Sequence, residues 1–137
     1  MSVLLDTNVL SELARPVPEA SVVDFCRNLE GSYISVITLH ELTLGAKLVK
    51  AKSKRTKLLT WIDSIQERYA QSILDVTPHI ANRAADLRAS ASTTGTALHI
   101  EDALIAATAQ EHSLQLATRN LKDFKRTGTS LVDPWKL

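Results

Sequence analysis

The sequence alternates short apolar segments with longer stretches of helical periodicity, and this alternation constrains the fold more than any other feature. The apolar segments have strand length and span residues 2–5, 33–37, 73–76, 114–118 and 130–132. The stretches between them place apolar residues three and four positions apart, over residues 9–13, 22–29, 38–50, 53–70, 78–88 and 101–111. Strands that alternate with helices favour a mainly parallel sheet covered on both faces. We therefore predict an α/β protein with a three-layer α/β/α sandwich.

The bulk properties of the chain narrow its class and its setting. A length of 137 residues and a hydrophobic content of 45% are typical of one globular domain, which we expect to span residues 1–137. No apolar run approaches the ~20 residues that cross a bilayer, so we expect no membrane association. Cys26 is the only cysteine, and one thiol forms no intramolecular disulfide. These features favour a cytoplasmic protein.

Acidic and amide side chains follow three of the predicted strands. In open parallel sheets, ligands bind beyond the carboxyl ends of the strands, so side chains placed there can share a site. Another acidic residue begins the helix that precedes the fourth strand. The residues in question are Asp6, Asn8, Glu41, Asp102, Asn120 and Asp123. We expect the four carboxylates to converge at one rim of the sheet.

Carboxylates that lie within a few ångströms of each other repel unless a cation is bound between them. Ligands that are all oxygen suit Mg²⁺ or Mn²⁺. Such an ion acidifies water and polarises a phosphate oxygen, which is the chemistry of phosphodiester hydrolysis. A zinc site is disfavoured, because the chain has one cysteine and its four histidines lack the spacing of zinc ligands.

Each acidic residue also has a structural interpretation. Asp6 could start a turn at the end of its strand. The spacing of Thr38 and Glu41 matches a capping box, so Glu41 could serve only its own helix. Asp102 could complement a helix dipole, and Asp123 could lie in an exposed turn. Taken singly, none of these positions decides between structure and catalysis.

A basic stretch joins the two helices predicted over residues 38–50 and 53–70. Six cations fall within eleven positions, namely Lys47, Lys50, Lys52, Lys54, Arg55 and Lys57. They could steer a phosphate backbone toward the site, with Lys47, Lys50, Lys54 and Arg55 as candidate RNA-binding residues. A solvated helix face explains the same pattern equally well.

Four segments of the chain, in their order and spacing, resemble the PIN domain, and specifically the toxin nucleases of the VapC and FitB type. These segments are Leu4–Glu12, Ile34–Leu42, Glu101–Ala109 and Leu116–Phe124. The closing Asp133-Pro134-Trp135 is also similar to the usual ending of that family. The resemblance covers essentially the whole chain.

The resemblance implies an endoribonuclease that depends on Mg²⁺ or Mn²⁺, with Asp6 and Asp102 as the metal-binding aspartates. Glu41 matches the family's glutamate. The fourth acid departs from some relatives, because Asn120 stands where FitB-like members can carry Asp, whereas Asp123 matches an acid found three residues later in others. The polar positions that usually orient the acids or a water are matched by Thr7, Asn8 and Thr118.

The resemblance further implies a homodimer that binds a small antitoxin. The expected antitoxin contact is the pair of helices over residues 39–50 and 53–70, with a groove formed by Leu44, Leu48, Leu58, Trp61 and Ile65.

Two other functions remain open on the sequence. A phosphohydrolase of the haloacid dehalogenase type would need an aspartate where this chain has Asn8. A non-catalytic PIN-fold module that binds nucleic acid or protein would be expected to lose its acidic residues, whereas three family positions are intact here. Saturable Mn²⁺ binding that is lost in Asp6→Asn would separate an enzyme from a binding module.

Overall fold

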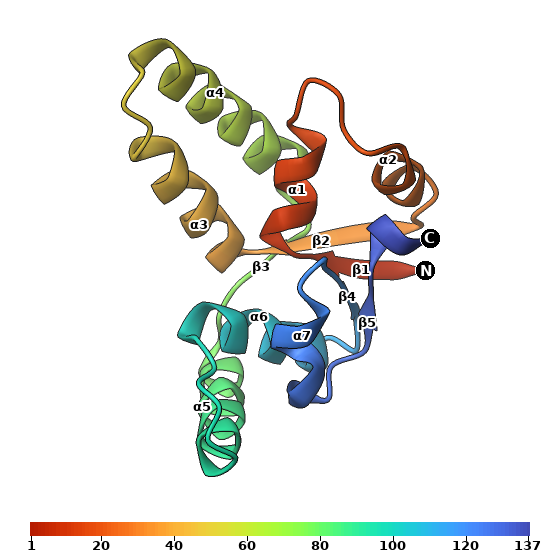
Figure 1. Cartoon of the computed structure of the whole chain (residues 1–137), viewed down its shortest axis with the longest axis vertical. Coiled ribbons are helices and arrows are strands. Elements are labelled where there is room, and N and C mark those ends of the chain that lie inside the picture. The colour runs from red at the N-terminus through yellow and green to blue at the C-terminus, as the bar shows by residue number, and fades with distance from the viewer.

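The computed structural model describes residues 1–137 and contains one five-stranded sheet in which every pair of neighbouring strands is parallel. The strands lie in the order β3-β2-β1-β4-β5. Their bounds are β1 Ser2–Leu5, β2 Gly31–Ser35, β3 Ile73–Leu74, β4 Gln115–Ala117 and β5 Leu131–Val132. The first strand is therefore central, with β4 paired to one edge of it and β2 to the other (Figure 1).

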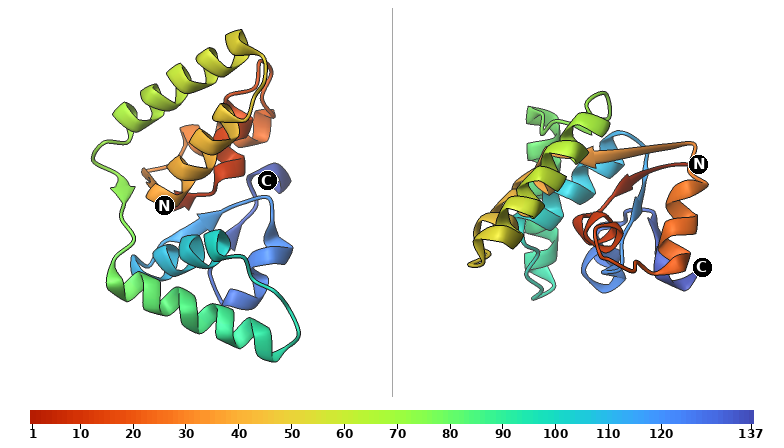
Figure 2. Two further views of the ribbon diagram at one scale, coloured as in Figure 1. Left: turned by 90° about the vertical axis from the view of Figure 1, so that its left-hand side faces the viewer. Right: turned by 90° about the horizontal axis from the view of Figure 1, so that it is seen from above.

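Seven α-helices cover the two faces of the sheet, and the predicted α/β/α sandwich is confirmed (Figures 1 and 2). One face is covered by α1 Thr7–Leu13, α2 Ala20–Arg27, α3 Val36–Lys47 and α4 Lys52–Arg68. The other is covered by α5 Pro78–Thr93, α6 Ile100–Glu111 and α7 Leu121–Phe124. Two short 3₁₀ helices, η1 Lys125–Thr127 and η2 Pro134–Lys136, flank β5. None of the helices combines the length and apolarity that crossing a membrane requires.

The central strand supplies both cores because successive strand residues point to opposite faces of a sheet. Val3 and Leu5 pack into the core formed with α1 to α4. Leu4, between them, packs against α6 and α7. All three side chains are at most 1% exposed, so the apolar run that opens the sequence is buried on both faces.

The start of α3 differs from the prediction and changes the interpretation of its first turn. Strand β2 ends at Ser35 and the helix begins at Val36, two residues before the predicted start at Thr38. The Ser35 hydroxyl accepts a hydrogen bond from the Ile37 amide at 3.0 Å and is the N-cap. The β-branched pair Val36-Ile37 suggested strand, but a serine cap placed just before it starts the helix there.

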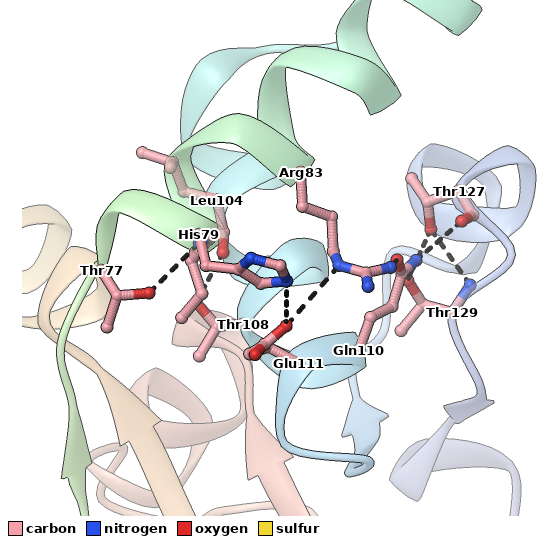
Figure 3. Close-up of polar contacts among 10 residues, drawn as sticks. Thr77, His79, Arg83, Leu104, Thr108, Gln110, Glu111, Thr127 and Thr129 are labelled. Atoms are coloured by element: carbon pink, nitrogen blue, oxygen red, sulfur yellow. Dashed lines mark hydrogen bonds and ion pairs between the residues drawn. The ribbon is translucent and has the colours of Figure 1, made fainter.

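Helices α5 and α6 form an antiparallel pair, and polar side chains join this pair to η1 (Figure 3). The imidazole of His79 lies 3.1 Å from the Glu111 carboxylate, which joins the two helices. Gln110 accepts a hydrogen bond from Arg83 at 3.1 Å and donates one to the Thr127 carbonyl at 2.8 Å. Helix α6 is thereby fixed on both sides, and its buried character, predicted from its apolar sequence, is confirmed.

Two further boundaries differ from the prediction. Helix α5 continues to Thr93 instead of ending at Arg88, because the polar residues of its last turn lie on an exposed face that periodicity does not register. The short α7 and η1, after β4, were not predicted. They are too short for a periodic pattern, and only Phe124 and Thr127 within them are buried.

Candidate active site

Asp6 lies at the carboxyl end of the central strand and is held from several directions. Its amide donates to the Ala117 carbonyl at 2.9 Å, which continues the pairing of β1 with β4. Its side chain is only 5% exposed. The Thr7 amide donates to Oδ1 at 2.8 Å, so Asp6 also caps α1. Asp6 therefore has the structural role that its sequence position allowed, at the turn after β1. This role uses only Oδ1, so Oδ2 can contact other residues.

The second oxygen of Asp6 is held by residues from both ends of the sequence. The buried Thr118 hydroxyl donates to Oδ2 at 2.7 Å, and the Asn8 side-chain amide donates to it at 3.2 Å. Thr118 accepts in turn from Asn8 at 3.3 Å and from the Asn120 amide at 3.0 Å. These contacts fix the Asp6 carboxylate in one orientation, which is the role that the family resemblance implied for Asn8 and Thr118.

Glu41 is brought to the same rim by the first two turns of α3. The Thr7 hydroxyl donates to its Oε1 at 2.7 Å and lies 3.3 Å from the Thr38 hydroxyl. The capping-box interpretation of Glu41 is wrong, because Ser35 caps α3 and Glu41 receives its hydrogen bond from α1. Thr7 thus joins the two acids, through its amide to Asp6 and through its hydroxyl to Glu41.

Asp102 lies in the first turn of α6 and faces the same cluster. Burial, and then the negative charges of Asp6, Asp123 and Glu41, raise the pKa of Asp102 to about 6 from an ordinary value of 3.8. No lysine or arginine forms a salt bridge with any of these four acids. The predicted carboxylates therefore lie near enough for their charges to raise the pKa of Asp102, and no salt bridge offsets those charges.

The two other central acids are affected in the same direction. Burial is the largest cause that raises the pKa of Asp6, and it outweighs the hydrogen bonds from Thr118, Thr7 and Asn8. Burial also raises the pKa of Glu41, with further contributions from the charges of Asp6 and Glu101. Such shifts are typical of carboxylates grouped to bind a cation or to exchange a proton.

An open groove runs over these side chains. Its lining residues come from the ends of β1 and β4, from α1 and α3, from the start of α6 and from the end of the chain. They are Asp6, Thr7, Asn8, Ser11, Glu12, Arg15, Glu41, Asp102, Arg119, Asn120 and Trp135. The groove thus contains both predicted metal-binding aspartates and three of the predicted supporting residues.

The fourth acid occupies a different place from the other three. Asn120 lines the groove, whereas Asp123 lies on α7 and lines a neighbouring cavity that shares Asp102 with the groove. The charge of Asp123 still reaches both Asp6 and Asp102, because it raises the pKa of each. A catalytic role for Asp123 stays a prediction, and its position indicates action through Asp102.

The donor set fits a hydrated Mg²⁺ or Mn²⁺ better than a fully caged ion. No three of the acidic, histidine or cysteine side chains come together closely enough to coordinate one ion. Magnesium is usually bound by one or two carboxylates and keeps several waters. Asp6 and Asp102 both line the groove, offer oxygen ligands only and form no salt bridge, which matches that preference.

The predicted basic stretch lies away from this groove. It spans the end of α3, the connection to α4 and the first turns of α4, at the end of the helical hairpin that points away from the sheet (Figures 1 and 2). Lys47 already lies six residues, or ~9 Å along the helix, beyond Glu41. Arg55 donates to the Val49 carbonyl at 3.2 Å and so supports the connection itself. RNA binding by this stretch stays a prediction.

Sequence reasoning missed several groove residues, among them Glu12, Arg15 and Arg119. Arg119 directly follows the strand that carries Thr118, so its position after a strand end could have marked it. Arg15 follows a short helix and had no such signal. Trp135 entered the sequence analysis only through the resemblance of the closing Asp133-Pro134-Trp135.

The hairpin of α3 and α4 carries an apolar surface. Leu44 and Leu48 are 48% and 70% exposed. Leu58 and Trp61 line a cavity beside Glu41, together with Ile62. Ile65 was predicted to line the antitoxin groove of this hairpin. Its side chain is only 4% exposed, so it belongs to the core instead.

Comparisons with known proteins agree with this architecture. The sequence profile of the PIN domain matches residues 3–129. Toxin FitB of Neisseria gonorrhoeae is 38% identical over 136 residues, which cover 97% of this chain and 98% of that relative. The VapC ribonuclease Y4jK of Sinorhizobium fredii is 32% identical, with 98% of each chain covered.

Solved structures extend the likeness to three dimensions. The crystal structure of FitAcB from Neisseria gonorrhoeae matches with a TM-score of 0.90 and 38% identity over 100% of both chains. A toxin–antitoxin complex from Klebsiella pneumoniae matches with a TM-score of 0.67 and 30% identity, covering 98% of this chain and 99% of that one. The sequence matches agree with the fold and with the carboxylates at the rim of the sheet. The chain therefore belongs to the PIN domain family.

Proposed function

We propose that the chain is a metal-dependent endoribonuclease and the toxin of a toxin–antitoxin pair. The observation that carries the proposal is that Asp6, Glu41 and Asp102 line one groove and that none of them forms a salt bridge. The names of two relatives, a toxin and a VapC ribonuclease, support the same activity.

In this proposal Asp6 and Asp102 hold one Mg²⁺ or Mn²⁺ ion. A bound divalent ion supplies positive charge that stabilises the attacked phosphate and makes a nearby water easier to deprotonate. Thr118 and Asn8 keep Asp6 in its orientation through the hydrogen bonds described above. Asp6, fixed in this way, needs little rearrangement when the ion binds.

Glu41 is proposed to accept the proton of the attacking water. Its raised pKa makes it a better proton acceptor than an exposed glutamate, and the Thr7 hydroxyl holds its Oε1 at the groove that Glu41 lines. Asp123 is proposed to add negative charge next to Asp102 and so to increase the affinity for the ion.

The decisive experiment compares RNA cleavage by the chain with cleavage by Asp6→Asn and Asp102→Asn, with the 5′ ends of the fragments sequenced. We expect each variant to fold and to lose cleavage, and Mn²⁺ binding measured by titration calorimetry to fall in both. Near-native cleavage by either variant would remove that residue from the proposed site. Saturable metal binding without any cleavage would favour the non-catalytic PIN-fold module.

An antitoxin is proposed to bind the apolar surface of the α3–α4 hairpin, where Leu44 and Leu48 are exposed. The toxin–antitoxin complex among the similar structures supports a partner of this kind. A homodimer is also proposed, and sedimentation of the chain alone would test it.

A further inference from the structure

The groove that holds the carboxylates also carries two basic residues, and these are the only lysine or arginine side chains in its lining. Arg15 follows α1, and Arg119 follows β4. An RNA strand is a polyanion, so a floor of clustered carboxylates repels it except where a cation intervenes. Cations at the rim are therefore the groups in a position to hold the phosphates next to the attacked one.

Arg15 is held at this rim by a buried acid. Its guanidinium lies 3.3 Å from the Glu12 carboxylate, and Glu12 is 6% exposed while Arg15 is 65% exposed. The Glu19 amide donates to the same carboxylate at 2.9 Å, and this hydrogen bond is the largest cause that lowers the pKa of Glu12. Glu12 thus stays ionised, fixes the segment after α1 and leaves most of the Arg15 guanidinium facing solvent.

Arg119 is held from the other side of the groove. Its guanidinium carbon lies 5.0 Å from the centroid of the Trp135 ring, a cation–π distance. Its amide donates to the Asn8 side-chain oxygen at 3.3 Å, which ties it to the network around Asp6. A guanidinium stacked on an indole keeps its edge donors free, and those donors match the geometry of a phosphate.

We propose that Arg15 and Arg119 bind the RNA phosphates that flank the attacked phosphate, and that Glu12 and Trp135 are their positioning residues. The inference rests on the proposed ribonuclease function and adds the residues that hold the substrate strand. It assigns the substrate contact to two fixed arginines at the groove and not to the lysines of the α3–α4 connection. Those lysines lie at the far end of the hairpin.

The test measures binding of a single-stranded RNA oligonucleotide by fluorescence anisotropy, in an Asp6→Asn background that does not cleave it. Arg15→Gln and Arg119→Gln are compared with the matched charge-removing controls Lys50→Gln and Lys54→Gln over a salt series. Each arginine variant is expected to weaken binding about tenfold and to lower the salt slope by about 0.7, the value for one lost phosphate contact on a single strand. The lysine controls are expected to leave the slope unchanged.

A second variant separates positioning from bulk charge. Glu12→Gln removes a negative charge near the substrate, so electrostatics alone predicts tighter RNA binding. If Glu12 positions Arg15, binding becomes weaker instead, and it does not weaken further when Arg15→Gln is added. Melting temperatures of all the variants show whether any loss of binding comes from unfolding.

Two results would overturn the inference. One is an unchanged salt slope in both arginine variants, and the other is an equal loss of slope in the lysine controls. Either result, obtained with a parent chain that cleaves RNA, leaves the ribonuclease proposal intact. A parent chain that neither cleaves nor binds RNA refutes both.

Discussion

Replacing Asp102 with asparagine should stabilise the metal-free protein while removing its activity. Below pH 3.8 the carboxyl is protonated in the folded and unfolded chains alike, and its burial then carries no electrostatic cost. As the pH rises from 3.8 to about 6, the carboxyl is already ionised in the unfolded chain, whereas burial and three neighbouring acids keep it protonated in the folded chain. Stability is therefore lost between these two pH values, and the loss is complete above about 6.

The magnitude follows from the gap between the two pKa values. The difference between 3.8 and about 6 corresponds to about 3 kcal/mol for a charge that water does not screen. Asp102 is only half-buried, so water reduces this penalty to about 1–2 kcal/mol. Asp102→Asn has nearly the same shape and no charge. We expect it to raise the free energy of unfolding by that amount at pH 8 in EDTA, and to have little effect near pH 4.

The assay is urea unfolding of both proteins at pH 4, 6 and 8, with EDTA and then with Mg²⁺. Mg²⁺ should stabilise the parent chain and not the variant, because a ligand stabilises only the state that binds it. A variant that is equally stable or less stable at pH 8 in EDTA would refute the argument that burial and the charges of three neighbouring acids destabilise the ionised form of Asp102.

Two other changes test the supports of the acids. Thr118→Val removes the hydroxyl that donates to Asp6, so the pKa of Asp6 should rise further and the acidic limb of the pH–rate profile should move to higher pH. The unpaired groups left behind should also cost about 1–3 kcal/mol of unfolding free energy, measured in urea. Ser35→Ala removes the cap of α3 and should cost about 1 kcal/mol, with a fall in cleavage because α3 carries Glu41. An unaltered pH profile in the first variant, or an unaltered urea midpoint in the second, would contradict these assignments.

The layered fold was predictable because its signal is repeated along the chain. Five apolar segments and six periodic stretches all favour the same architecture, and one misplaced boundary does not alter it. The start of α3 was misplaced because Val36 and Ile37 favour strand by their side chains, while the Ser35 cap that decides the matter is a single hydroxyl. Local propensity cannot weigh these two against each other.

The carboxylates of the site could be predicted because each follows a strand or begins a helix at the same rim. Their supports could not all be found in this way. Thr7 bridges Asp6 and Glu41 because α1 packs beside α3. No pattern within either segment encodes that contact. The same holds for Arg119 on Trp135, which brings together the ends of β4 and of the chain.

The hydrogen bond between Thr118 and Asp6 joins residues separated by 112 positions. Strand β1 is synthesised before its partner β4 and before the threonine that orients Asp6. A growing or truncated polypeptide that stops before Thr118 therefore carries Asp6 without the hydroxyl that fixes its orientation. For a protein proposed to be harmful to the cell that makes it, this order of synthesis delays any hydrolytic activity until β4 has been made.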